Sequence, residues 1–170
     1  MNRQSRGNQR RSSHSNRQRT LYVRATAVVV KEGKILLVKH NRENQWALPG
    51  GRVTATEEPS RRAVLEVAEE TGLLIDNPIF VGRYAGTVAA HQIFLAQGNG
   101  DPKPNRRELR DVCWWDGKTP LDVEQHVNAI MAIVRNWVKE NAPDELDPGQ
   151  ADIQALPELK QLVEGFEDAN

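Results

Sequence analysis

The sequence predicts an α+β protein, with a mixed β-sheet held between helices in an α/β/α sandwich. Short runs rich in β-branched residues recur through the middle of the chain, a composition typical of strands. Two longer segments consist of strong helix formers or have apolar residues near helical spacing. The order along the chain is strands, helix, strands, helix, which is typical of a sheet packed between helices.

The first two strands are expected to form a hairpin. Order should begin near Leu21, and residues 22–30 and 35–39 are apolar and rich in β-branched residues. Glu32-Gly33 lies between the two runs and has the composition of a tight turn. Residues 46–51 follow, and their proline and two glycines predict an irregular loop.

A helix is expected from Pro59 to Thr71. Proline fits the first turn of a helix, where its missing N–H costs nothing. Residues 61–71 contain strong helix formers, and Gly72 suits the position just beyond a helix end.

The second half of the chain is expected to add three strands and one more helix. Residues 79–90, 92–96 and 109–115 have strand-like composition, whereas residues 97–104 are rich in Gly, Asn and Pro and predict a loop. Residues 123–139 carry apolar side chains near helical spacing and predict an amphipathic helix.

The two ends differ from the middle in composition and charge. Residues 1–20 are rich in Arg, Ser, Asn and Gln, contain no acid and predict a disordered basic tail. Residues 142–170 are predicted to be an acidic C-terminal extension with a short helix over residues 157–166. A single folded domain is therefore expected over residues 21–141. The Arg- and Ser-rich start leaves a transit peptide open, although it lacks an amphipathic stripe.

Composition limits the classes of function. The formal net charge is zero, so the whole chain has no bias toward nucleic acid or anionic membranes. No apolar run approaches the ~18 residues of a membrane span, and the single cysteine, Cys113, fits a reducing compartment. We therefore expect a cytoplasmic protein without a membrane partner. RNA contact through the basic tail and assembly into a homodimer stay open.

The helix over residues 59–71 carries a cluster of carboxylates. Residues three and four apart are neighbours on a helix, so Glu66 meets both Glu69 and Glu70. Their mutual repulsion costs a few tenths of a kcal/mol per pair, and a bound hard cation such as Mg²⁺ would reverse its sign. A solvated acidic helix face is the alternative interpretation.

The surrounding segment makes the metal-binding interpretation specific. Residues 51–73 read GRVTATEEPSRRAVLEVAEETGL. This resembles the signature of the Nudix hydrolase family: Gly, five residues, Glu, seven residues, Arg-Glu-apolar, one residue, Glu-Glu, one residue, Gly-apolar. The positions that match in register are Gly51, Glu57, Glu66, Val67, Glu69, Glu70, Gly72 and Leu73. The lead-in at residues 46–50 is also similar, and the strand order extends the resemblance over residues 21–141.

The resemblance implies cleavage of a pyrophosphate bond in a nucleoside diphosphate linked to another group. Mg²⁺ or Mn²⁺ would be the cofactor, and a nucleotide the small-molecule substrate. The implied metal ligands are Glu66, Glu70, Glu69, Glu57 and the carbonyl of Gly50. The implied catalytic groups are Glu66, Glu69 and Glu70, with a general base that is either one of these or the later Glu108. The implied substrate contacts are Gly51, Trp46 and Arg62.

One position departs from the family pattern. Leu65 stands where the family has an arginine that is thought to hold a neighbouring glutamate by a charge-assisted bond. Arg62, one turn before Glu66, and Arg61 are candidates to substitute for it. The alternative is a Nudix-fold module with weakened catalysis that binds or regulates through a nucleotide or RNA.

Several other residues are expected to be structural. The four histidines have no metal-ligand spacing, and packing competes with base stacking as the role of Trp46. Adjacent Trp114 and Trp115 on one strand should point to opposite faces, one into the core and the other toward the site. An ordinary surface role competes with a catalytic one for Glu108, which lies beside Arg106, Arg107 and Arg110.

Overall fold

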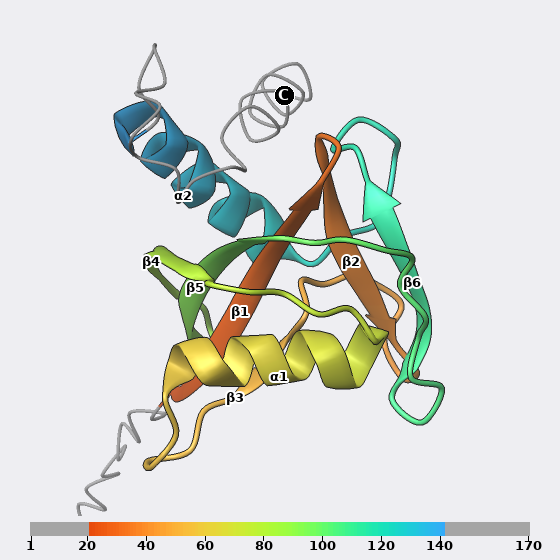
Figure 1. Ribbon diagram of the computed structural model, residues 1–170, viewed down its shortest axis with the longest axis horizontal. Helices are drawn as coiled ribbons and strands as arrows, with labels where there is room; N and C mark the ends of the chain where they lie inside the picture. The colour runs from red at the N-terminus through yellow and green to blue at the C-terminus, as the bar shows by residue number, and fades with distance from the viewer. Residues whose placement is uncertain (1–20, 142–170) are drawn as a thin grey trace, which may run out of the picture.

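One mixed sheet lies between two helices in the computed structural model (Figure 1), which describes residues 21–141. The predicted basic tail and acidic extension lie outside the described residues. The elements are β1 (Tyr22–Lys31), β2 (Lys34–His40), β3 (Gly50–Arg52), α1 (Pro59–Thr71), β4 (Ile79–Ala85), β5 (Ala89–Gln97), β6 (Leu109–Trp115) and α2 (Gln125–Asn141). The predicted α+β class, with a mixed sheet between helices, is confirmed.

The sheet has the strand order β4-β5-β1-β2-β6, and β3 pairs with β1 outside this path. β1 and β5 are parallel, whereas the other paired strands are antiparallel. Because successive side chains of a strand point to opposite faces, β1 supplies both cores. Val28 and Val30 belong to the core on the α2 side, and Ala25, Ala27 and Val29 belong to the core on the α1 side.

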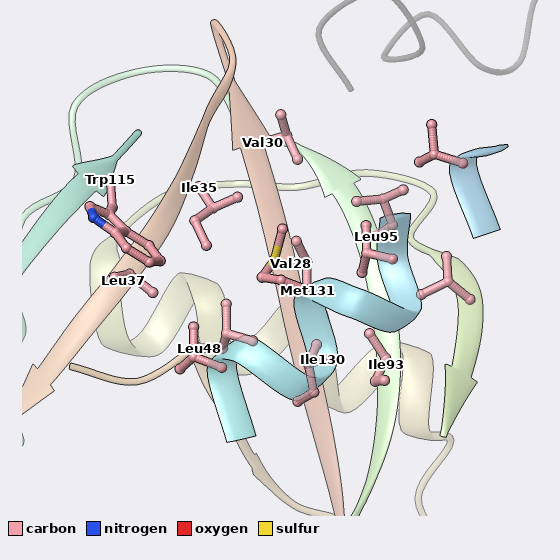
Figure 2. Close-up of a cluster of buried hydrophobic side chains, with 14 residues drawn as sticks. Val28, Val30, Ile35, Leu37, Leu48, Ile93, Leu95, Trp115, Ile130 and Met131 are labelled. Carbon is pink, nitrogen blue, oxygen red and sulfur yellow. The ribbon is translucent and has the colours of Figure 1, made fainter. Parts of the chain in front are cut away.

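Each helix covers one face of the sheet with its apolar side. Figure 2 shows Ile130 and Met131 of α2 against Val28, Ile93 and Leu95 of the sheet. The second core contains Ala63 and Val67 of α1, which are both fully buried. No helix within residues 21–141 is long and apolar enough to cross a membrane.

β1 and β2 pair only beside the turn that joins them and then diverge, as Figure 1 shows. The pairs are Val30 with Ile35 and Lys31 with Lys34. The short strand β3 occupies the edge of β1 that this divergence frees, opposite Arg24–Thr26. The sheet therefore opens between β1 and β2 beyond this turn.

Three details differ from the sequence-based expectation. The strand predicted over residues 79–90 is wrong, because Gly86 to Val88 form a turn that separates β4 from β5. The Gly86 N–H donates to the carbonyl of Ala89 across this turn, at 2.9 Å. Thr87 and Val88 are β-branched, so composition alone conceals the turn. Residues 50–52, predicted as part of a loop, form β3, and the second helix begins and ends two residues later than predicted.

Candidate active site

α1 begins and ends as its sequence predicts. Pro59 lies in its first turn, and Gly72 follows it with a left-handed φ of 71° and donates its N–H to the carbonyl of Ala68. The two ends fix which residues face the sheet. Glu66 and Glu70 are buried together with Ala63 and Val67, so two carboxylates enter the interior beside apolar side chains.

Glu70 lies in the opening between β1 and β2. Its side chain is 2 % exposed, and the Gly50 N–H donates to its Oε2 at 3.3 Å. Its other oxygen, Oε1, is 3.9 Å from Nε2 of His40 at the end of β2. The carboxylate therefore contacts β2 and β3, the short strand that pairs with β1.

Burial governs the protonation of Glu70. Burial first, and the neighbouring Glu66 carboxylate second, raise the pKa of Glu70 to about 8, against the opposing effects of the Arg24 charge and the Gly50 N–H. Without a cation, Glu70 is therefore largely protonated at neutral pH. A divalent cation at this carboxylate would displace the proton and remove the repulsion from Glu66.

The two glycines of β3 make room for these carboxylates. A Cβ atom on Gly51 would lie 1.6 Å from Oε1 of Glu66. A Cβ atom on Gly50, whose φ is 155°, would lie 2.2 Å from the backbone oxygen of Ala25. Glycine at position 51 thus brings the backbone against the Glu66 carboxylate, while glycine at position 50 lets β3 approach β1.

Arg62 gathers the remaining carboxylates. Its guanidinium hydrogen-bonds Glu66 one turn later and lies 3.7 Å from Glu57 and 3.6 Å from Glu69. Glu57 comes from the loop before α1, so this arginine connects the loop to two turns of the helix. The Nε of Arg62 is buried and has no partner among the described residues. Arg61, the other candidate to substitute for the family's arginine, is exposed.

The oxygen donors fit a hard cation in their chemistry. Carboxylates are the ligands that Mg²⁺ and Mn²⁺ prefer, and burial first, with the Glu66 charge second, raises the pKa of Glu70. Within residues 21–141, however, no three Asp, Glu, His or Cys side chains are gathered into a ready metal site. In this arrangement Arg62 provides the positive charge that Glu57, Glu66 and Glu69 share.

A large cavity lies beside these residues. Its volume is about 910 Å³, and its lining comes from β1, the end of β2, the β4–β5 turn, the loop before β6 and the start of α2. His40, which contacts Glu70, is part of the lining, as is the exposed Glu108. The structure thus places Glu108 on the same cavity as the neighbour of Glu70. Arg107 also lines it, whereas Arg106 and Arg110 bind backbone carbonyls.

Trp46 is partly buried in the loop before β3. It packs against the core on the α2 side, and Lys39 lies 5.4 Å from the centre of its ring. Trp114 and Trp115 do point to opposite faces, with Trp115 in one core and Trp114 packed against the other. None of the three lines the cavity.

Sequence reasoning missed the histidine side of the cavity. Thr26 Oγ1 is 2.9 Å from His91 Nδ1, and the rings of His91 and His126 lie 4.8 Å apart. Glu124 binds Nδ1 of His126 at 3.0 Å. One signal was available, since Arg24 and Thr26 are polar and alternate with apolar residues on the same strand. His14 lies outside the described residues.

The sandwich and the glutamate-bearing helix against a Gly-Gly strand define a protein of the Nudix class. The NUDIX domain family model matches residues 21–152. The chain belongs to this family, as its sequence signature predicts.

Individual relatives agree with this membership. The chain is similar to a MutT-like protein of Streptomyces ambofaciens, with 29 % identity over 111 residues, which are 64 % of this chain and 70 % of the relative. It shares its fold with a Nudix hydrolase family member from Chromobacterium violaceum, at 23 % identity and a TM-score of 0.62, covering 89 % and 98 % of the two chains. An ADP-ribose pyrophosphatase from Streptococcus suis gives 21 % identity and a TM-score of 0.60, covering 75 % and 97 %.

Proposed function

We propose that this protein is a divalent-metal-dependent hydrolase that cleaves a pyrophosphate bond in a nucleoside diphosphate linked to another group. The observation that carries the proposal is the buried Glu70 carboxylate, which lies beside Glu66 and accepts the N–H of Gly50. Two adjacent buried carboxylates are costly without a cation. Family membership and the names of the pyrophosphatase and MutT-like relatives support the same class of reaction.

Glu66 and Glu70 are the proposed ligands of Mg²⁺ or Mn²⁺, and the Gly50 carbonyl is a further proposed ligand. When bound, such a cation neutralises charge on phosphoryl oxygens and lowers the pKa of a bound water. Glu69 is 56 % exposed on the outer side of the cluster, and Glu57 precedes the helix. These two carboxylates are proposed as ligands of an additional ion or as partners that orient the first.

The general base is proposed to be a carboxylate on the rim of the cavity or in the helix cluster. Glu108 lines the cavity, and its charge adds a small contribution to the pKa of Glu70, which is raised mainly by burial. It is therefore close enough to act electrostatically on the central carboxylate. Its exposure leaves it free to accept a proton from water and release it to solvent.

Arg62 is proposed as the residue that positions Glu66. It supplies the charge that Leu65 cannot, from one helical turn before its partner. The alternative function, a nucleotide- or RNA-binding module with weakened catalysis, is motivated by Leu65 and, for RNA, by the basic composition of residues 1–20. The contacts of Arg62 favour the enzyme.

The test is an assay of phosphate and nucleotide release with a panel of substrates that includes ADP-ribose, UDP-sugars, dinucleoside polyphosphates and nucleoside triphosphates. Wild type is compared with Glu70→Gln, in Mg²⁺, in Mn²⁺ and in EDTA. We expect metal-dependent turnover of at least one substrate and its loss in the variant. Absence of metal-dependent turnover on every substrate, or full activity of Glu70→Gln, contradicts the proposal.

A further inference from the structure

Arg24 is a half-buried cation on the cavity wall without a counter-ion in contact. Within residues 21–141, its guanidinium makes no hydrogen bond and no ion pair, although it lines the cavity. In the pairing of β1 with β3, it lies directly opposite Arg52. Like charges in opposite positions of an antiparallel pair destabilise the sheet, so this position has a cost that a bound anion would offset.

The charge of Arg24 affects the pKa values of several groups around the cavity. It lowers the pKa of His91 and of Glu124, after larger effects in each case, and it opposes the rise in the pKa of Glu70. Arg24 lies opposite His91 of β5 in the pairing of β1 with β5, and it lines the same cavity as His40, whose Nε2 is 3.9 Å from Oε1 of Glu70. An anion bound by Arg24 would lie in the cavity that His40, the neighbour of Glu70, also lines.

The histidine side of the cavity forms an aromatic wall, defined here as Tyr84, His91 and His126. The ring centres of Tyr84 and His91 are 5.7 Å apart, and those of His91 and His126 are 4.8 Å apart. Hydrogen bonds to Thr26 and Glu124 fix the two histidines. Burial first, and His126 second, lower the pKa of His91 to about 4, so this ring is neutral at physiological pH.

A cation and a fixed aromatic wall on one cavity select a ligand with an anionic part and a planar part. Arginine is well suited to bind phosphate oxygens, and aromatic side chains accept the flat face of a base. A volume of about 910 Å³ is sufficient for a nucleotide. The opposite orientation is less favourable, because the wall contains no arginine or lysine to neutralise a phosphate.

We propose that Arg24 binds a phosphate of a nucleoside diphosphate whose base lies against the wall of Tyr84, His91 and His126. The inference rests on the proposed function for the class of ligand and adds its orientation: phosphates toward Glu70, base toward α2. Arg24 is then a specificity-determining residue outside the glutamate helix. Inorganic phosphate would contact only Arg24, and a nucleoside would contact only the aromatic wall.

The experiment is calorimetric titration of the full chain in EDTA with ADP, GDP, CDP and UDP, with the four matching nucleosides and with inorganic phosphate. We expect Arg24→Gln to weaken the tightest diphosphate by about tenfold or more and to leave its nucleoside within about twofold. Arg24→Lys should retain part of the affinity. Tyr84→Ala should weaken both ligands. Arg83→Gln is the matched control, because it removes the same charge from an exposed position beside Phe80.

Each departure from this pattern has a defined meaning. Wild-type affinity in Arg24→Gln, absence of diphosphate binding to wild type, or inorganic phosphate binding as tightly as the diphosphate would overturn the inference. Melting temperatures of the variants distinguish lost binding from lost folding. If the binding pattern holds while metal-dependent turnover is absent, the proposed hydrolase function fails and the ligand site stands.

Discussion

The guanidinium of Arg62 hydrogen-bonds the carboxylate of Glu66, four residues later on the same helix. This pairing places a positive charge against the glutamates although position 65 holds leucine. The same guanidinium approaches Glu57 and Glu69, so one arginine offsets the repulsion of three carboxylates. Positive charge at this site is therefore supplied from a different position on the same helix face.

Replacing Arg62 should reduce catalysis more than stability. We expect Arg62→Gln to lower kcat by about 10- to 100-fold, the range typical of residues that orient metal ligands, with a smaller change in KM. Arg62→Lys should recover part of the rate, because it keeps the charge but loses the planar fork.

Arg61→Gln is the control, since Arg61 is exposed on the same helix. Manganese affinity, measured by electron paramagnetic resonance, should fall with kcat for Arg62→Gln. Equal rates for the two glutamine variants contradict the role.

The substitution Leu65→Arg tests whether Arg62 already compensates for the arginine that the family has at this position. If Arg62 already positions Glu66, Leu65→Arg alone should change kcat by less than about threefold. In the Arg62→Gln background, the same substitution should restore kcat by about tenfold, because a new guanidinium becomes available beside Glu66. Steady-state rates of the four proteins form a double-mutant cycle. A large gain from Leu65→Arg in wild type would instead indicate an enzyme whose catalysis has decayed.

The glutamate helix could be predicted from sequence because its geometry is local. The spacing of Glu66, Glu69 and Glu70 fixes their common face wherever the helix packs, and Pro59 and Gly72 mark its ends. The position of Glu70 between two diverging strands is not local. It depends on the pairing of β3 with β1. Glycine has a low strand propensity, so Gly50 and Gly51 do not predict this pairing.

The cavity was beyond the reach of sequence reasoning for a related reason. Arg24, His91 and His126 are far apart in the chain and meet only through the parallel pairing of β1 with β5 and the position of α2. Single histidines without metal-ligand spacing carry little information by themselves. The polar residues on the core face of β1 were the one local sign, and their partners could be identified only from the fold.

Glu70 should make the metal-free protein less stable as pH rises. Its pKa is raised from 4.5, the ordinary value for a glutamate, to about 8 in the folded protein, so the folded state binds more protons between these values. Stability therefore falls through this window as pH rises. In EDTA, we expect the melting temperature of Glu70→Gln to decline less than that of wild type from about pH 5 to about pH 8.

Glu69→Gln, which removes an exposed carboxylate, should follow the wild-type profile. Added Mg²⁺ at pH 8 should stabilise wild type but not Glu70→Gln, whereas parallel profiles for all three proteins would refute the assignment.

Alanine at Gly50 and at Gly51 should have different consequences, although the two residues are adjacent. At Gly50 the new Cβ would meet the backbone oxygen of Ala25, which cannot move without breaking the pairing of β1 with β3. We expect Gly50→Ala to destabilise the fold by about 2 kcal/mol or more. At Gly51 the Cβ would meet the Glu66 side chain from Oε1 at 1.6 Å to Cγ at 2.8 Å, and this side chain, unlike backbone, can change rotamer. Gly51→Ala should therefore keep a near-wild-type melting temperature while metal-dependent turnover falls by at least about tenfold.

Urea denaturation and initial rates separate the loss of stability from the loss of turnover. Full activity of folded Gly51→Ala would show that Glu66 does not need its present position, and the assignment of Glu66 as a metal ligand would then fail.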